Sequence, residues 1–220
     1  MKNAYRLFIG LLICAASALS YADEVPVQNA SSASDVLLPM GPNTTVWVQS
    51  TTQEIELYNG STPGVPANSQ GLNIGGAGAS SQIKALAGDL QNLGQTTVSS
   101  NGSLVVSSTE DTNYFDKNLT IDGGSVLVRK PYYSTQNGSN VTISDGSLEF
   151  LGRFRVGYQS AATFDQTGGT VTFNTIESGE NKVVSIGYKS GANGTYNMSG
   201  GTFTTPIPVL IGDQSGATGV

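Results

Sequence analysis

The apolar residues between positions 97 and 220 fall in short alternating runs that return at a regular interval. Apolar and polar residues alternate in this way along a half-buried β-strand, and a central pair drawn from Gly, Asn and Asp is typical of a tight turn. Each run therefore predicts a strand, a turn and a second strand. Five copies of the phrase occur: "TVSSNGSLVV" (97–106), "LTIDGGSVLV" (119–128), "VTISDGSLEF" (141–150), "FDQTGGTVTF" (164–173) and "YNMSGGTFTT" (196–205).

Glycine occupies the sixth position of every copy, and a Ser or Thr residue follows it. Glycine adopts left-handed backbone conformations and lets a second backbone approach closely, so we expect it at a corner of the chain. Successive copies of this glycine lie 22, 22, 23 and 32 residues apart. These predicted corner glycines are Gly102, Gly124, Gly146, Gly169 and Gly201.

A second phrase recurs between the copies of the first, as "VGYQSAAT" (156–163), "IGYKSGANGT" (186–195) and "IGDQSGATG" (211–219). Repeats of about 20 to 25 residues built from short strands indicate a solenoid, in which each coil buries its apolar side against its neighbours. An antiparallel sandwich is the alternative, but a sandwich does not require one phrase at one interval. We therefore predict an all-β fold, with a β-solenoid over 97–220 and an inserted loop at 174–181.

The chain begins with a short basic segment, followed by the apolar run "LFIGLLICAASAL" and the small residues Ser20 and Ala22. This order is typical of a secretory signal peptide, which we place at residues 1–22. The apolar run is shorter than the roughly 20 residues that a membrane span needs, and no later run is long enough either. We therefore expect an exported protein with no transmembrane helix in its mature chain.

Residues 23–96 are polar and lack the repeated phrase, so we expect an irregular N-terminal or capping region there. Alternating runs at 44–49 and 53–58 predict two short strands within it. A helix is predicted over 80–94, because its apolar residues share one helical face and a glycine can end it. The residues that carry this pattern are Ile83, Leu86, Leu90, Leu93 and Gly94.

The composition excludes several kinds of chemistry. The chain has no histidine, and its single cysteine, Cys14, lies in the predicted signal peptide. Zinc sites, disulfides, cysteine nucleophiles and Ser-His-Asp triads are therefore not expected. The stretch "GGAGASS" (75–81) lacks the aspartate of calcium-binding glycine repeats. We predict no metal site and no cofactor, and the net charge of −6 argues against nucleic acid as a partner, because phosphates would be repelled.

Two tyrosines are the candidate ligand-binding residues. Tyr158 and Tyr188 occupy the same place in two copies of the second phrase, where Asp213 stands in the third. Stacked coils would bring the two rings together, and such a pair could contact a glycan by ring packing. The alternative is that the rings only cover a corner of the coil. Tyr132 and Tyr133 are further aromatic residues of this kind.

Some parallel β-helices are polysaccharide lyases or hydrolases, which need clustered carboxylates beside a cation. The alternative for such a cluster here is a solvated face, because its aspartate stands at a turn position and its arginines alternate as outward strand residues do. The residues closest to the pattern are Asp145, Glu149, Arg153 and Arg155, with Asp122 and Asp165 one coil away.

Threonine rows offer a further candidate surface. Thr170 and Thr172 would lie in register with Thr202 and Thr204 on the next coil, as in flat ice-binding or carbohydrate-binding faces. Threonine is also simply a favourable strand residue, and the preceding copies read "SLE" and "SVL" instead. The row is therefore expected to be two coils deep.

The pairing of "IGYKSGANGTYNMSGGTFTT" with "VGYQSAATFDQTGGTVTF" resembles the short repeats of bacterial autotransporter passengers and of surface proteins with a PEP-CTERM export tail. The match is good over 156–205, partial back to residue 97 and absent from 23–96. The resemblance implies a right-handed parallel β-helix on or outside a Gram-negative-type cell. The chain departs from those families in carrying neither a translocator barrel nor a sorting tail. Since "IGDQSGATGV" (211–220) reads as an uncapped coil, we expect a fragment of a longer protein, or else a short protein that pairs end to end.

Together these patterns predict an exported bacterial surface or secreted β-solenoid that serves as an adhesin, a stalk or a display scaffold, without catalytic activity. The expected partner is an extracellular glycan or the surface of a host or neighbouring cell. The alternative is a carbohydrate-active β-helix enzyme whose site lies partly downstream of this segment.

Overall fold

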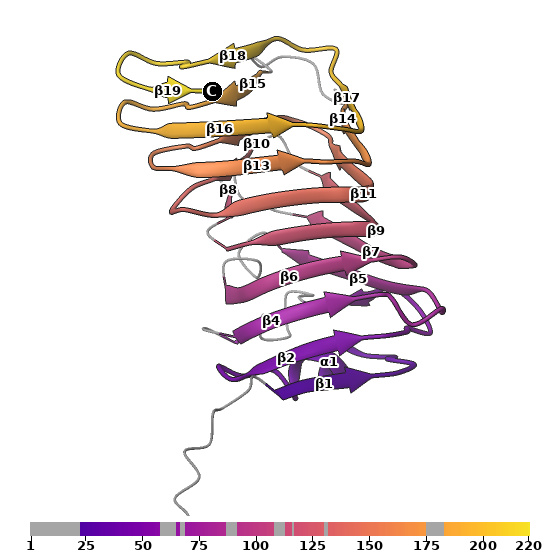
Figure 1. Ribbon diagram of the computed structural model, residues 1–220. Coiled ribbons are helices and arrows are strands. Elements are labelled where there is room, and N and C mark those ends of the chain that lie inside the picture. Colours follow the sequence, from indigo (N-terminus) through magenta and orange to yellow (C-terminus); the bar gives the residue numbers. More distant parts are fainter. Residues whose placement is uncertain are drawn as a thin grey trace, which may run out of the picture.

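The computed structural model describes residues 23–57, 65–66, 69–86, 92–107, 113–115, 117–129, 132–174 and 183–220. In these residues the chain winds into coils, and the strands of each coil stack on those of the next along one axis (Figure 1). The strands form one sheet of 14 strands and one sheet of five. The ladders between successive coils are parallel, for example β9 with β11 and β12 with β15. The predicted all-β solenoid is confirmed.

Three columns of strands form the sides of the solenoid. Face 1 consists of β1 (Asp23–Val27), β2 (Thr44–Val48), β4 (Ser69–Ile74), β6 (Leu93–Ser99), the first half of β9 (Leu119–Arg129), the first half of β11 (Asn140–Phe150), β13 (Ala162–Gln166), β16 (Asn193–Met198) and β19 (Thr218–Gly219). Face 2 consists of β3 (Ile55–Glu56), β5 (Ser81–Leu86), β7 (Gly102–Ser107), the second halves of β9 and β11, β14 (Thr170–Phe173) and β17 (Thr202–Thr204). Face 3 is the five-stranded sheet of β8 (Asn113–Phe115), β10 (Tyr132–Thr135), β12 (Arg153–Val156), β15 (Val184–Ile186) and β18 (Val209–Ile211).

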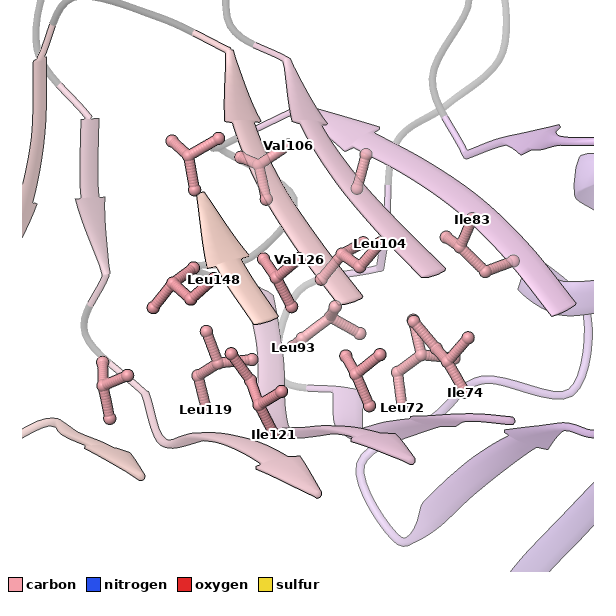
Figure 2. Packing of buried hydrophobic residues seen from close by; sticks show 14 of the residues in the cluster. Leu72, Ile74, Ile83, Leu93, Leu104, Val106, Leu119, Ile121, Val126 and Leu148 are labelled. Carbon is pink, nitrogen blue, oxygen red and sulfur yellow. The ribbon is translucent and has the colours of Figure 1, made fainter. Parts of the chain in front are cut away.

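Alternating side chains from all three faces fill the interior. On face 2, Leu104, Val126 and Leu148 lie in register on successive coils, and each is almost completely buried. Figure 2 shows these side chains pointing from β7, β9 and β11 toward aliphatic residues such as Leu119 and Ile121 of face 1. Burying one such side chain contributes about 1.5–3 kcal/mol, so the continuous core is the main source of stability. A coil alone could not bury these residues.

Large aromatic side chains fill the C-terminal part of this core. Phe150 stacks on Phe154 at a centroid distance of 4.3 Å and on Phe173 at 4.9 Å. Phe164 stacks on Tyr196 of the next coil at 4.7 Å. Because the rings come from faces 1, 2 and 3, they join the three faces of neighbouring coils.

The region before residue 97 is more regular than the sequence indicates. Residues 23–96 contribute β1 to β5 and the start of β6, which pair in parallel with the later coils. The predicted strand at 44–49 forms β2, and the one at 53–58 contains only the two-residue β3. These coils lack the repeated phrase, yet they bury the same alternating residues, because stacking requires apolar inward positions rather than one particular corner.

The helix predicted over 80–94 is wrong for Ser81–Leu86, Leu93 and Gly94, which belong to strands. Ser81–Leu86 forms strand β5, in which Ile83 and Ala85 are buried and Lys84 points outward. Leu93 begins a different strand, β6, on face 1. Of the residues that carry the helical pattern, Ile83 and Leu93 are inward residues of two different strands, whereas Leu86 stands on the same side of β5 as Lys84. Leu90 lies outside the described residues.

The two ends of the solenoid differ. At the N-terminal end the helix α1 (Ala33–Leu37) lies beside β1 and β2 (Figure 1), and its Val36 joins the hydrophobic core with no exposed surface. At the other end Leu210 and Ile211 of β18 are 37% and 63% exposed. The first end is thus covered by the chain itself, and the last coil presents apolar side chains.

No helix among the described residues is both long and apolar enough to cross a bilayer. The predicted signal peptide at 1–22 and most of the inserted loop at 174–181 lie outside the described residues.

Candidate functional site

The second repeated phrase forms the corner between faces 3 and 1. Gly157, Gly187 and Gly212 stand at this corner with φ angles of 72°, 73° and 65°. This left-handed backbone turns the chain, and hydrogen bonds between successive coils continue through it: Tyr188 N–H donates to the Gly157 carbonyl and Asp213 N–H to the Gly187 carbonyl, both at 2.9 Å. The residue after each glycine is therefore held directly above its counterpart on the coil before.

This corner brings the two predicted tyrosines together. The rings of Tyr158 and Tyr188 stack at a centroid distance of 5.4 Å with an angle of 13° between their planes. The Arg155 guanidinium carbon lies 3.7 Å from the centroid of the Tyr188 ring and 5.2 Å from that of Tyr158. The Lys189 ammonium lies 4.5 Å from the Tyr158 centroid. Each such cation–π contact stabilises the corner by about 0.5–2 kcal/mol, depending on its exposure.

Burial limits what the tyrosines offer a ligand. Tyr158 is only 7% exposed and Arg155 only 5% exposed, whereas Tyr188 and Lys189 are partly exposed. The Tyr158 ring contacts both the ring of Tyr188 and the Lys189 ammonium. A sugar could not stack on Tyr158 without displacing one of these groups. The tyrosine pair therefore covers the corner and positions two cations, and the groups within reach of a ligand are Lys189 and the edge of Tyr188.

Arg155 stands at the centre of an outward column on face 3. Its neighbours in register are Ser134 on β10 and Ser185 on β15. The Ser185 hydroxyl donates a 2.7 Å hydrogen bond to the Asp213 carboxylate. The Ser134 hydroxyl is completely buried and has no hydrogen-bond partner among the described residues. Burial lowers the pKa of Arg155, and the nearby charge of Arg153 acts in the same direction; the guanidinium nevertheless stays protonated at neutral pH.

Sequence reasoning did not foresee this column. It considered Arg155 as a member of a carboxylate cluster, with a solvated outward strand face as the alternative, and did not single out Ser134, Ser185 or Lys189. The alternation in "RFRV" (153–156) was the available signal, since Phe154 and Val156 are core residues and Arg155 must then point outward. The alternation does not show which residues of the adjacent coils lie next to Arg155.

The predicted corner glycines of the first phrase all lie where the chain turns from face 1 to face 2. A Cβ added at any of them would lie 2.1–2.8 Å from a backbone oxygen of the previous coil, too close for any side chain. In the last three copies the glycine itself is left-handed. In the first two copies the left-handed residue stands one position earlier, at Asn101 and Gly123. The glycines concerned are Gly102, Gly124, Gly146, Gly169 and Gly201.

The carboxylates and arginines of the predicted catalytic cluster do not come together. Asp122 and Asp145 are neighbours in register at the corner between faces 1 and 2, where the Ser144 hydroxyl donates to Asp122 at 2.8 Å. Arg153 and Arg155 stand on β12, in the five-stranded sheet of face 3. The two sets occupy different sheets, so neither of these arginines faces the carboxylate pair in the manner of a lyase site.

The other two carboxylates of that cluster are occupied by amide partners. Asp165 on face 1 accepts hydrogen bonds from the side chains of Asn140, at 3.1 Å, and Asn197, at 2.8 Å. Glu149 on face 2 accepts one from Asn174 at 2.7 Å. These bonds join neighbouring coils and are structural. Among the described residues, no three His, Cys, Asp or Glu side chains gather as they would around a metal ion.

The threonine rows lie in register as predicted, with Thr170 opposite Thr202 and Thr172 opposite Thr204. The column of the first pair continues through hydroxyl residues of the preceding coils, Ser147, Ser125 and Ser103. Face 2 therefore presents a hydroxyl column five coils long, of which the sequence analysis identified two coils. The side chains of Tyr132 and Tyr133 lie outside the described residues.

Comparisons with protein-family models, with curated proteins and with solved structures found no match to this chain. The fold is therefore established by the strand register itself. The resemblance to autotransporter passengers and PEP-CTERM surface proteins stays a prediction.

Proposed function

We propose that the chain is a non-catalytic, exported scaffold of a bacterial cell surface, of the kind found in adhesins and stalks. The observation that carries this proposal is the uninterrupted stack of coils, in which one sheet path runs from β1 through β2, β4, β6, β9, β11, β13 and β16 to β19. A stack with one continuous core resists bending and holds its surface residues at a fixed spacing of about 4.8 Å per coil.

The separation of the carboxylates from the arginines favours this scaffold over a carbohydrate-active enzyme. General acid–base cleavage of a glycan needs a carboxylate within hydrogen-bond reach of the reacting sugar and a charge-stabilising partner beside it. Asp122 and Asp145 lie in the 14-stranded sheet, while Arg153 and Arg155 lie in the five-stranded sheet. A sugar at one set would not touch the other.

Incubation with acidic and neutral polysaccharides tests the proposal. The products are measured by size-exclusion chromatography of the polysaccharide and by an assay for new reducing ends. We expect polymer length to remain unchanged for every polysaccharide. If the wild-type protein shortens a polysaccharide and the Asp145→Asn variant does not, the chain is a carbohydrate-active enzyme and the scaffold proposal is wrong.

We further propose that the scaffold associates with a second copy through the coil that contains β18. Val209, Leu210 and Ile211 of β18 are 39%, 37% and 63% exposed, and the outer edge of this strand has no strand paired to it among the described residues. Exposed apolar strand edges pair readily with another chain. On the opposite side of the stack, α1 covers the core and Pro26 interrupts the donors of β1, so contact between the β18 edges of two copies is favoured over a head-to-tail filament.

A further inference from the structure

The single tryptophan of the chain points outward from face 1. Trp47 lies on β2 between Val46 and Val48, whose side chains are completely buried. Since side chains alternate along a strand, the indole stands on the outer side of the sheet, where it is partly exposed. It lies outside the hydrophobic core that the described residues form. The aromatic ring is therefore available to a ligand that approaches from outside.

The next coil holds the indole in one place. The Nε1–H group of Trp47 donates a 2.7 Å hydrogen bond to the Gly75 carbonyl. Its Cζ2 atom lies 3.9 Å from the position that a Cβ on Gly76 would take, so the ring extends over a corner that carries no side chains. A ring that is already fixed loses little conformational entropy when a ligand packs on it.

Pro26 enlarges the apolar surface beside the indole. It is the neighbour of Trp47 in register on β1, and it is exposed. The strands β1 and β2 lie side by side (Figure 1), and neighbouring strands are about 4.8 Å apart. Pro26 and Trp47 together form a small apolar platform. The C–H face of a sugar ring packs on aromatic surfaces of this kind.

Side-chain amides surround this platform. Gln49 follows Trp47 on the same side of β2, and its side-chain oxygen accepts a 2.7 Å hydrogen bond from the amide nitrogen of Gln28. Asn73, in register with Trp47 on β4, donates its amide nitrogen to Glu24 at 2.7 Å. Among the described residues, the Gln49 amide nitrogen and the Gln28 amide oxygen have no hydrogen-bond partner. Sugar hydroxyls both donate and accept, so they can bond to these two groups.

The column that contains Trp47 continues along the axis as neutral polar side chains. Asn73 is followed in register by Thr97, Thr120 and Thr142, and all four are partly exposed. Parallel stacking repeats the strands about every 4.8 Å. A linear chain of sugars that begins on Trp47 would therefore meet an amide or a hydroxyl on each of the coils that follow.

The charges on this face favour a neutral ligand. The parts of the described strands that form face 1 contain no lysine or arginine. Glu24 is the carboxylate beside the platform, and the Asn73 amide already binds it. An acidic polysaccharide or a nucleic acid would meet a like charge there and gain no ion pair. A protein partner would require a larger apolar patch than two rings.

We propose that the outer side of face 1 binds a linear neutral glycan, with one sugar packed on the platform of Trp47 and Pro26. The hydroxyls of this sugar bond to the side-chain amides of Gln49 and Asn73, and the next sugars lie along the threonine column that begins at Thr97. The proposal names the partner class of the scaffold and so rests on the proposed function. Its site lies on a different face from the corner that the stacked tyrosines cover.

Tryptophan fluorescence observes this site directly, because Trp47 is the only tryptophan of the chain. Titration with cellohexaose, a neutral linear oligosaccharide, should change the emission of the wild-type protein in a saturable manner. Hexagalacturonate has the same number of sugars but carries carboxylates, and it should leave the emission unchanged. Isothermal titration calorimetry measures the affinity of the variants that lack the indole.

Variants assign the contacts. Trp47→Ala should weaken the binding of cellohexaose at least about tenfold, and Trp47→Phe should weaken it less, because it keeps an aromatic ring. Gln49→Ala removes one hydrogen-bonding amide and should weaken binding about threefold. Gln82→Ala removes an outward, exposed amide from β5 on face 2, so it is the matched control and should leave the affinity unchanged.

Each of four other outcomes overturns the proposal: no saturable change in emission, a heat of binding without a change in emission, an equal response to hexagalacturonate, or equal weakening by Gln49→Ala and Gln82→Ala. Thermal unfolding followed by circular dichroism shows whether each variant is folded, and the emission of the wild-type protein decides if one is not. Absence of binding leaves the scaffold proposal in place. Shortening of cellohexaose together with a response of the Trp47 emission would overturn the scaffold and leave the glycan site.

Discussion

Single glycines decide whether one coil can lie on the next. Gly201 has a φ of 80°, and a Cβ added to it would lie 2.4 Å from the carbonyl oxygens of Gly168 and Gly169. Gly191 has a similar φ of 82°, but nothing lies within 4 Å of the corresponding Cβ position. Gly191 therefore needs glycine only for its left-handed backbone, whereas Gly201 also needs it because the backbone of the previous coil lies too close for a side chain.

We expect Gly201→Ala to lower the free energy of unfolding by more than about 3 kcal/mol and Gly191→Ala by only about 1 kcal/mol, since the second variant has the backbone strain alone. Urea unfolding followed by circular dichroism measures both. Equal losses in the two variants would contradict the assignment of Gly201 to a close contact between coils.

A hydrogen-bonded pair formed by the partly buried Tyr196 and the buried Gln166 is expected to make the free energy of unfolding depend on alkaline pH. The Tyr196 hydroxyl donates a 2.6 Å hydrogen bond to the side-chain oxygen of Gln166, whose amide nitrogen in turn donates to the Thr202 carbonyl at 3.0 Å. Burial raises the pKa of Tyr196 above its ordinary value of 10.0. The unfolded chain therefore loses this proton at a lower pH than the folded chain does.

The contribution of Tyr196 is complete below its unfolded pKa and is lost as the pH rises toward the folded pKa. We expect the free energy of unfolding to fall between pH about 9 and about 11, and the fall to be smaller in Tyr196→Phe. The variant should also be less stable by about 1–2 kcal/mol at the lower pH, because the Gln166 oxygen loses its donor. An identical fall in both proteins would show that Tyr196 does not couple to folding.

At the scale of the strand, β12 connects the aromatic residues of three faces. Its Phe154 is completely buried and packs against Phe150 of β11, Phe164 of β13 and Phe173 of β14, with centroid distances of 4.3, 5.8 and 6.0 Å. Removal of the ring would leave a cavity that surrounding rigid strands could fill only in part.

We expect Phe154→Ala to lower the free energy of unfolding by about 3–5 kcal/mol. Met198→Ala serves as the control, because Met198 is an apolar residue that is 49% exposed on β16; its truncation should cost less than about 1 kcal/mol. Chemical unfolding of both variants decides the comparison. A cost for Phe154→Ala as small as that for Met198→Ala would mean that the rings do not hold the strands together.

At the scale of the whole molecule, the proposed association with a second copy depends on the exposed residues of β18. Val209 and Ile211 continue inward core columns, in register with Val184 and Ile186, yet both are exposed. Sedimentation velocity of the wild-type protein should show a dimer that forms as the concentration rises. Ile211→Lys should weaken it at least about tenfold, since a charge cannot be buried unpaired at the contact.

The matched control lies at the opposite end. Leu38, next to α1, is 84% exposed, and Leu38→Lys should leave the association unchanged. If Leu38→Lys weakens association as much as Ile211→Lys does, the contact joins unlike ends and the chains form filaments. If the wild-type protein stays monomeric at all concentrations, the proposed association with a second copy is wrong.

The sequence by itself determined the class of fold and the positions of its corners, because a corner is a local requirement that every coil repeats. Gly146 and Gly201 each lie against a carbonyl of the previous coil, so both positions need a glycine. The repeat interval can therefore be read from the sequence. Inward residues such as Leu104 and Val126 follow from the same repeat, since side chains alternate along a strand.

Only the tertiary structure decided what lies beside what on adjacent coils. An alternating run does not reveal its partner strand, so Ser81–Leu86 resembled a helix until β3 and β7 were seen on either side of it. For the same reason Arg155 was grouped with Asp145, its neighbour in sequence, although stacking places it against Tyr188 on another face. Contacts within a solenoid join residues about one coil apart in the chain, and that separation is what sequence patterns do not specify.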